Sequence, residues 1–529
     1  MKFLQNIVGA GRTGSAWRGG TMACLLAGAS LTASAAVGID YDAALTGEAG
    51  GNAFAPFYMM SNNGGRLTSA SGVMLDVQAH HRLDRSRRFS YAFGIEALAG
   101  WQSAVDYERF TPMEDGSGVF GMISRNPSAI WLQQLYGQIK YRQVFLQAGM
   151  RQDTPRNINP RLSSGDLVRG VNARPIPGVW IGFIDFVDIP FTRGWVQIEG
   201  QVGYGKFTDK GWLENHFNYY TGHINTGSWY TYKRCYFRTK PSQPFSVTVG
   251  MQTAGVFGGT TSHYEQGRLV RSVKNSSSIK TFFNMFLPRE GTGEGYYVGN
   301  SLGCWDIFLR YRLNDGSQVR AYHQRPFETG SGIGFLNGFD GLWGIEFNPS
   351  GALTLGGWIR GAVVEYIDTY NQSGPNHYDP ADNPGTDFPS HTSGGDEYYN
   401  NQFYNSYANY GMSIGTPMLP GPIYNRDGFL GFTVNRLRGF HIAVEGDVSP
   451  AVSYRLMGGY RKGYGTINQP LTHTVDDASV MAEVDWRVHS VPGLALKGRV
   501  GFDAGSMLGD RFGVSVGVTY SGLFNIGKK

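Results

Sequence analysis

Cysteine is scarce in this chain. Cys24, Cys235 and Cys304 are the three cysteines among 529 residues, and Cys24 lies in an N-terminal segment that we expect to be removed. At most one disulfide can then form, which excludes a disulfide framework, and we expect two free thiols in strands. Long apolar runs are missing too. After the N-terminal segment no run of about 18 apolar residues occurs, which excludes helical membrane spans.

A large net charge is also missing. The formal net charge is +5, and Lys2, Arg12 and Arg18 near the N-terminus supply three positive charges without any acid beside them. The rest of the chain therefore carries about +2, which argues against nucleic acid or a polybasic membrane surface as the partner.

The N-terminus has the pattern of an export signal. The apolar run "TMACLLAGASLTASAA" follows the basic residues, and Ala33–Ala35 matches the small-x-small pattern of a signal-peptidase site. A membrane-anchoring helix is the alternative, but the run is short and no stop-transfer charges follow it. We expect residues 1–35 to be a cleaved signal peptide and residues 36–529 to form one exported domain.

Aromatic residues and glycine are abundant, at 14% aromatic and 76 Gly, and several segments alternate with period two. In "VMAEVDWRVH" (480–489), Val480, Val484 and Trp486 share one face, whereas Glu483 and Asp485 share the other. One face is apolar and the other is charged. The same alternation occurs in residues 196–204, 305–313, 440–448 and 512–520.

Alternation alone does not choose between two all-β folds, because a soluble β-sandwich alternates as well. The export signal, the length and the aromatic residues at strand ends favour an antiparallel transmembrane β-barrel of the outer membrane. About 494 exported residues, at roughly 25 to 30 per strand with its loops, predict about 18 strands, within 16 to 20. The strand-end aromatic residues are Tyr91, Trp101, Trp195, Tyr204, Trp305 and Tyr520.

A barrel this wide is an open aqueous tube unless something fills it. The predicted lumen face mixes carboxylates such as Glu96 and Glu199 with cations such as Arg310 and Arg499, so these groups can pair with each other or with inserted loops. Long connections are typical of the extracellular side. We expect them at residues 102–130, 154–193, 207–228, 254–300 and, longest of all, 368–425.

Seven distinctive sequence blocks are spread across the exported part: "FAPFYMMSNNGGR" (54–66), "NPRLSSGDL" (159–167), "NARPIPG" (172–178), "GNSLGCWD" (299–306), "SGP" (373–375), "GGDEYYNN" (394–401) and "YGMSIGTPMLPGPIYN" (410–425). In content and order these blocks resemble the capsule-assembly Wzi family, in the branch with long extracellular loops. The resemblance implies an outer-membrane barrel of about 18 strands, occluded by inserted segments, that acts as a lectin-like protein holding capsular polysaccharide on the cell.

The stretch "YYNNQFYNSYANYG" (398–411) is the predicted polysaccharide contact. Aromatic rings stack on the C–H faces of sugars, and amides and hydroxyls bond to sugar hydroxyls. The alternative is a loop whose tyrosines pack onto one another and plug the mouth of the barrel. The candidate residues are Tyr398, Tyr399, Asn400, Asn401, Tyr404, Tyr407 and Tyr410.

Two arginines in a proline-rich connection are further candidates. Arg161 and Arg174 could hold acidic sugars, because a guanidinium can donate two parallel hydrogen bonds to a carboxylate. Pro160, Pro175 and Pro177 prevent helix and ladder pairing, so the segment must be irregular. The alternative is a structural role, in which each arginine bonds loop carbonyls or a carboxylate of the lumen.

Enzymatic chemistry has little support in the sequence. No G-x-S-x-G elbow or Gly-rich phosphate loop occurs, and the histidines show no metal-ligand spacing, so we expect no enzyme, metal or cofactor. The expected partners are surface polysaccharide and outer-membrane lipid, and the oligomeric state stays open. Two other functions remain in contention: a saccharide porin with an open lumen, and a lipid-modifying enzyme at the lipid-facing rim.

Overall fold

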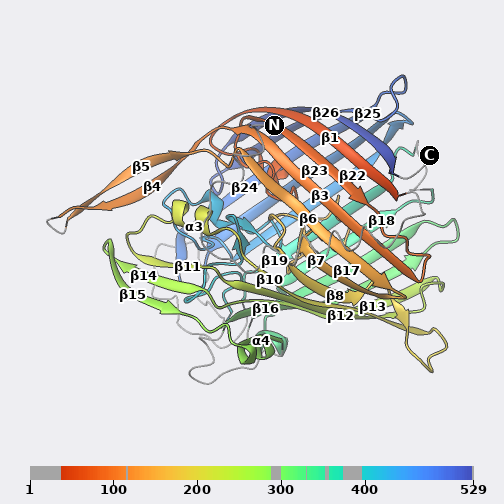
Figure 1. The fold of residues 1–529 in the computed structure, drawn as a ribbon, viewed down its shortest axis with the longest axis horizontal. Coiled ribbons are helices and arrows are strands. Elements are labelled where there is room, and N and C mark those ends of the chain that lie inside the picture. The colour runs from red at the N-terminus through yellow and green to blue at the C-terminus, as the bar shows by residue number, and fades with distance from the viewer. Residues whose placement is uncertain are drawn as a thin grey trace.

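A computed structural model describes residues 37–114, 117–286, 299–328, 330–351, 357–372 and 396–526. The expected signal peptide and residues 373–395 of the longest expected loop lie outside the described residues. Eighteen antiparallel strands close into one barrel (Figure 1). The first and last strands, β1 and β26, close it and pair from Val37–Ile526 to Gly51–Phe512. The predicted all-β barrel is confirmed.

The barrel strands follow one another around the wall in chain order, with β9 pairing with β10 as an extension of β8. Their bounds are β1 Val37–Gly51, β2 Gly72–His81, β3 Phe89–Gln102, β6 Ile130–Tyr141, β7 Val144–Met150, β8 Gly178–Phe183, β9 Val187–Asp188, β10 Val196–Lys206, β12 Trp229–Thr239, β13 Phe245–Phe257, β16 Asn300–Arg312, β17 Gln318–Phe327, β18 Gly341–Asn348, β19 Gly361–Asp368, β22 Leu437–Ser449, β23 Val452–Gly465, β24 Pro470–Arg487, β25 Leu494–Gly505 and β26 Arg511–Ile526.

The two faces of the wall follow the alternation of the sequence. On β24, Val480 and Val484 are 52% and 46% exposed on the outer face, whereas Glu483 on the inner face is 1% exposed. The outer side chains form an apolar belt, which is the surface that a lipid-facing barrel requires. Cys235 and Cys304 are free thiols on β12 and β16, as expected.

The two ends of the barrel differ, and we call them the turn end and the loop end. At the turn end the connections are as short as two residues, between β6 and β7 and between β22 and β23, and Val37 and Ile526 also lie there. The loop end carries the long connections, and its β4–β5 hairpin projects far beyond the wall (Figure 1). Its elements are α2 Phe57–Met60, β4 Val105–Pro112, β5 Gly118–Arg125, α3 Lys210–His216, β11 Gly222–Thr226, β14 Thr260–Glu265, β15 Arg268–Lys274, α4 Ile279–Phe286, α5 Gly330–Ile333, β20 Ala408–Asn409, β21 Met412–Ser413 and η3 Pro422–Tyr424.

Within the described ranges, every helix is too short or too polar to cross a membrane.

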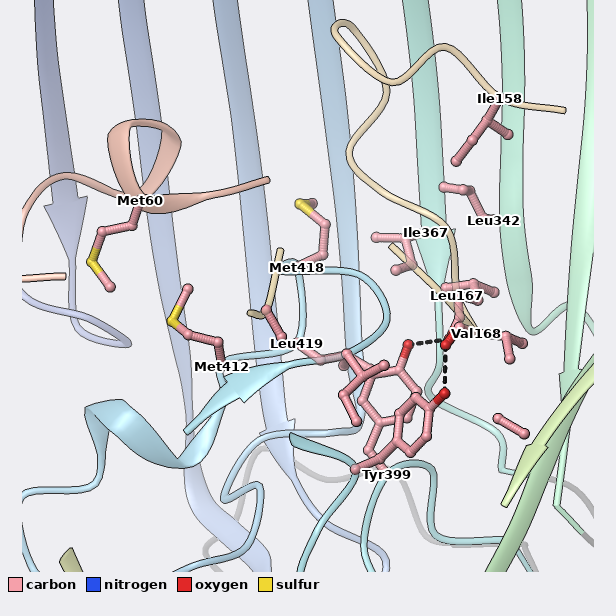
Figure 2. Packing of buried hydrophobic residues seen from close by; sticks show 14 of the residues in the cluster. Met60, Ile158, Leu167, Val168, Leu342, Ile367, Tyr399, Met412, Met418 and Leu419 are labelled. Atoms are coloured by element: carbon pink, nitrogen blue, oxygen red, sulfur yellow. Dashed lines mark hydrogen bonds between the residues drawn. The ribbon is translucent and has the colours of Figure 1, made fainter. Parts of the chain in front are cut away.

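Three segments from the loop end fold into the lumen, and we call them together the plug: residues 52–71, 151–177 and 396–436. Their apolar side chains form the main buried cluster of the molecule together with inward residues of the wall. Figure 2 shows Leu167 and Val168 of the second segment beside Tyr399 of the third.

Two expectations about the connections need correction. The predicted connection 154–193 is wrong in its second half, because residues 178–183 form β8 of the wall. The alternation there is too short to be recognised in sequence. The first plug segment, residues 52–71, was not expected to be a long connection.

Candidate functional site

The plug is fastened to the wall by buried carboxylates. On β19, Glu365 accepts hydrogen bonds from the hydroxyl of Ser163 (2.7 Å) and the backbone N–H of Ser164 (2.6 Å), and also from the hydroxyl of Tyr322 on β17. Hydrogen bonds to a charged acceptor are about twice as strong as neutral ones. One wall carboxylate therefore fixes the second plug segment.

A wall histidine joins two plug segments. The Nε2 atom of His441 lies 2.6 Å from the carbonyl oxygen of Leu162, and its Nδ1 atom lies 2.7 Å from the hydroxyl of Tyr58. A carbonyl oxygen can only accept, so Nε2 carries the proton and Nδ1 accepts from Tyr58. Both ring nitrogens of this buried residue are used to hold the plug.

Arg161 meets lumen carboxylates. Its Nε donates to Glu445 Oε2 at 2.8 Å, and its Nη2 lies 3.6 Å from Glu483 Oε1. Arg455 of the wall donates to the carbonyl oxygen of Arg161. This arrangement matches the structural alternative for Arg161, although about half of its side chain stays exposed.

Four of the candidate tyrosines are buried. Tyr398, Tyr399, Tyr404 and Tyr407 are 1 to 3% exposed. A ring with both faces covered by protein cannot stack on a sugar. The expectation that these four rings present open faces is therefore wrong for this structure, because the rings pack inside the plug instead.

The hydroxyls of these tyrosines are also used internally. Tyr399 donates to the carbonyl oxygen of Leu167, and Tyr407 donates to that of Val168 over 2.7 Å. Tyr398 donates to Asp340 Oδ2 at 3.0 Å. Burial raises the pKa of the Asp340 carboxyl to about 7. Together these bonds tie the third plug segment to the second and to the loop that precedes β18.

The two candidate asparagines are partly exposed and shape the loop. Asn401 Oδ1 accepts from the backbone N–H groups of Phe403 and Tyr404, at 2.8 and 3.0 Å. Asn400 exchanges hydrogen bonds with the backbone of Phe432, donating at 2.9 Å and accepting at 2.8 Å. Asparagine suits this position because its short amide mimics a backbone turn.

Tyr410 and Arg174 lie together at the loop end and are half-buried. The Arg174 guanidinium is stacked between two rings, 4.3 Å from the centroid of Trp131 and 4.4 Å from that of Tyr410. Burial lowers the pKa of Arg174 to about 10, and its Nε has no hydrogen-bond partner. Trp212 of α3 is half-buried beside Gly411. We call Arg174, Trp212 and Tyr410 the aromatic patch.

The patch rests on a short helix with two buried titratable groups. The hydroxyl of Tyr410 donates to the carbonyl oxygen of Thr208 at 2.9 Å, and its N–H donates to Asp209 Oδ2 at 3.4 Å. Burial raises the pKa of Asp209 to about 7 and lowers the pKa of His216 to about 4. The ring of His216 stacks on Trp212, with 4.5 Å between centroids.

Below the plug, a cavity of about 580 Å³ lies inside the turn end of the barrel. Its wall includes Arg238, Ser246, Arg310 and Gln318, which lie near the turn-end termini of β12, β13, β16 and β17. Residues 151–154, 156 and 157 of the plug line it as well. Such a volume is in the range of small-molecule sites, roughly 300 to 1,000 Å³.

Comparisons with known proteins show which fold the chain resembles. No protein-family model and no curated protein matches the chain. Among solved structures, the chain resembles Wzi, described as an outer-membrane protein involved in group 1 capsule assembly in Escherichia coli and as a carbohydrate-binding β-barrel. The TM-score is 0.51 and the identity 14%, over 94% of this chain and 87% of that one. This likeness shows a Wzi-like barrel fold.

Other barrels match less well. OccK5 (OpdH) of Pseudomonas aeruginosa matches with a TM-score of 0.41 and 9% identity, over 92% of this chain and 98% of that one. OccAB2 of Acinetobacter baumannii matches with a TM-score of 0.35 and 11% identity, over 92% and 98%.

Sequence reasoning did not find the residues that hold the plug. The plug partners of Glu365 and His441 lie at least 200 residues away from them in the chain, so the sequence around each residue gives no sign of the contact. Trp212 was not noticed either. Its one signal was an aromatic residue within a connection that also carries Phe217, Tyr219 and Tyr220.

Proposed function

We propose that this protein is a non-enzymatic outer-membrane barrel that retains capsular or another surface polysaccharide on the cell, as expected for a relative of the Wzi family. The observation that carries the proposal is the plugged lumen beneath a loop end with half-exposed aromatic side chains. A wide barrel whose interior is packed and hydrogen-bonded is poorly suited to passing solutes. The loop end, with its half-exposed aromatic side chains, then offers the surface for a polymer.

The orientation follows from the connections. In transmembrane barrels the short turns face the periplasm and the long loops face outward. The turn end therefore faces the periplasm, and the aromatic patch faces the medium. Residues 1–35 are proposed as the export signal that brings the chain there.

We place the polysaccharide at the aromatic patch. The rings of Tyr410 and Trp212 offer partly open faces for sugar C–H groups, and Arg174 adds a half-buried cation beside the ring of Tyr410. Asn400 and Asn401 stay partly exposed in the same plug segment as Tyr410 and are proposed as further polar contacts. A polymer that visits many copies of such a weak site on one cell is held firmly, because the contacts sum.

Deleting the gene in the source organism tests retention. We expect the total surface polysaccharide to be unchanged and the polymer to move from the cell-bound fraction to the culture supernatant. Complementation with Tyr410→Ala/Trp212→Ala should restore the barrel in the membrane but not retention. The matched control is Phe120→Ala, which removes an exposed ring of the β4–β5 hairpin. Equal cell-bound polysaccharide in parent and deletion strains would refute the proposed function.

The alternative function is a saccharide channel, which the cavity at the turn end favours. Single-channel recording in a planar bilayer separates the two. The plugged barrel should give a current near the baseline, whereas steady, sugar-blocked conductance of the wild-type protein would favour the channel.

A further inference from the structure

The cavity at the turn end carries an unbalanced positive charge. Six arginines line it, against two aspartates. The aspartates are already engaged: Asp185 lies 3.9 Å from Arg85, and Asp153 lies 3.8 and 3.9 Å from Arg169 and Arg234. Arg156 pairs with Glu199 at 3.5 Å, and Arg320 pairs with Glu346. The remaining arginines of the cavity are Arg151, Arg238 and Arg310.

These three arginines of the cavity have only neutral hydrogen-bond partners. Arg151 donates to the side-chain oxygens of two glutamines, at 2.8 and 3.2 Å. Arg238 donates to Gln197, and Arg310 donates to the carbonyl oxygen of Pro241. None of the three forms an ion pair with any carboxylate among the residues that the structure describes. In addition, the Nε of Arg310 is buried without a partner.

Uncompensated guanidinium groups inside a barrel concentrate a positive potential, because the wall has a low dielectric constant. Arginine prefers carboxylate and phosphate partners, whose oxygens match its planar fork. The cavity therefore has the electrostatics of an anion site, and the anion is not supplied by the described part of the chain.

The other lining groups suit a sugar. The side chains of Gln201, Thr248 and Gln318 line the cavity and form no hydrogen bond with any described residue. Amides and hydroxyls of this kind donate to and accept from sugar hydroxyls. Phe186 adds an apolar surface, and Arg238 stacks on its ring at 4.0 Å. Charge, hydrogen-bonding groups and an aromatic face are thus present in one cavity.

We propose that this cavity binds an acidic sugar unit, a saccharide that bears a carboxylate, from the periplasmic side of the barrel. The site lies at the opposite end from the aromatic patch and extends beyond the proposed function. Arg151, Arg238 and Arg310 bind the carboxylate, and the unpaired amides and hydroxyl bind the ring hydroxyls. The site is separate from the retention of polymer outside the cell.

Titration calorimetry on the purified full-length barrel in detergent tests this site. The probes are digalacturonate, the neutral sugar maltotriose and inorganic phosphate. We expect digalacturonate to bind with an affinity that falls as salt is added, maltotriose to bind at least tenfold more weakly, and phosphate not to compete at equal concentration. Digalacturonate binding no tighter than maltotriose, or phosphate competing equally, would overturn the proposal.

Variants locate the binding. Arg151→Gln/Arg310→Gln should weaken digalacturonate binding at least tenfold. The matched control is Arg82→Gln at the same end, whose exposed side chain pairs with Asp40 outside the cavity. Folding of the double variant is judged by heat-modifiable gel migration. If it does not fold, Arg310→Lys replaces it. This variant keeps the positive charge but lacks the planar guanidinium, and it should lose less affinity for digalacturonate than the double variant. Unchanged affinity in the folded variants refutes the assignment even if deletion of the gene releases polysaccharide.

Discussion

The hydroxyl of Tyr407 donates a hydrogen bond to the backbone carbonyl oxygen of Val168 over 2.7 Å, across 239 residues of chain. The hydroxyl of Tyr230 on β12 lies 3.0 Å from the same tyrosine oxygen. Two plug segments and the wall therefore meet at one buried phenol. A buried carbonyl that loses its donor costs about 1 to 3 kcal/mol, so this contact should contribute measurably to the stability of the plug.

Tyr407→Phe removes this hydroxyl and keeps the ring. We expect the barrel to stay folded and the plug to open more often, because Val168 loses its donor. Hydrogen exchange of the amides in residues 166–171 should accelerate about 5- to 150-fold, which corresponds to about 1 to 3 kcal/mol. The control is Tyr410→Phe, whose hydroxyl bonds to Thr208 instead. Unchanged exchange in Tyr407→Phe would show that the bond does not stabilise the plug.

Glu365→Ala should unfasten the plug from the wall. It removes the acceptor shared by Ser163, Ser164 and Tyr322 and leaves their donors unpaired in the lumen. We expect brief openings in planar bilayers that the wild-type protein lacks. Asp485→Asn is the matched control, because Asp485 is also a lumen carboxylate but pairs with Lys497 of the wall. Silent recordings from Glu365→Ala would mean that other contacts suffice to keep the lumen closed.

Gly415→Val should disturb the packing of Tyr399. A Cβ atom at Gly415 would collide with the Tyr399 hydroxyl and with the carbonyl oxygen of Leu167. Overpacking of this kind typically costs about 1 to 3 kcal/mol. We expect faster proteolytic cleavage within residues 396–436 of the folded barrel. Gly498→Val, where an added Cβ meets no atom within 4 Å, should be cleaved at the wild-type rate.

The strands of the wall could be predicted from the sequence because the alternation of apolar and polar residues is visible within each strand. Glu483 and Val484 are neighbours in sequence, and period-two geometry alone sends one to the lumen and the other to the outer face. The strand count followed from length for a similar reason, since strands and turns have narrow size ranges. The expectation that lumen charges pair with inserted loops was also correct, as Arg66 of the plug binds Glu96 of the wall.

The fate of the candidate tyrosines could not be predicted in this way. Tyr399 and Tyr410 stand in one polar, aromatic stretch without any period, yet one is buried and the other is half-exposed. The difference is set by partners far away in sequence, Leu167 for Tyr399 and Thr208 for Tyr410. Residues 52–71 were missed for the same reason, since Phe57 meets its acceptor Asp503 across 446 residues.

The support of the aromatic patch should respond to pH through two opposing groups. Asp209 has its pKa raised to about 7 from 3.8 by burial. Between these values the folded loop holds a proton that the unfolded loop lacks, so its stability falls as pH rises, by up to about 1.4 kcal/mol per pH unit. His216 has its pKa lowered to about 4 from 6.5 by burial. Between pH 4 and 6.5 the unfolded loop holds the extra proton, so its stability rises with pH.

In the wild-type protein these two slopes oppose each other between pH 4 and 6.5, and the stability of the α3 loop should be nearly flat there. Asp209→Asn leaves the slope of His216, so protection of residues 207–217 from hydrogen exchange should increase with pH. His216→Gln leaves the slope of Asp209, so protection should decrease as pH rises toward 7. Exchange rates are corrected for their intrinsic pH dependence with residues 166–171 as the internal reference. If the protection of residues 207–217 changed in the same direction with pH in both variants, the two groups would not titrate as their burial requires.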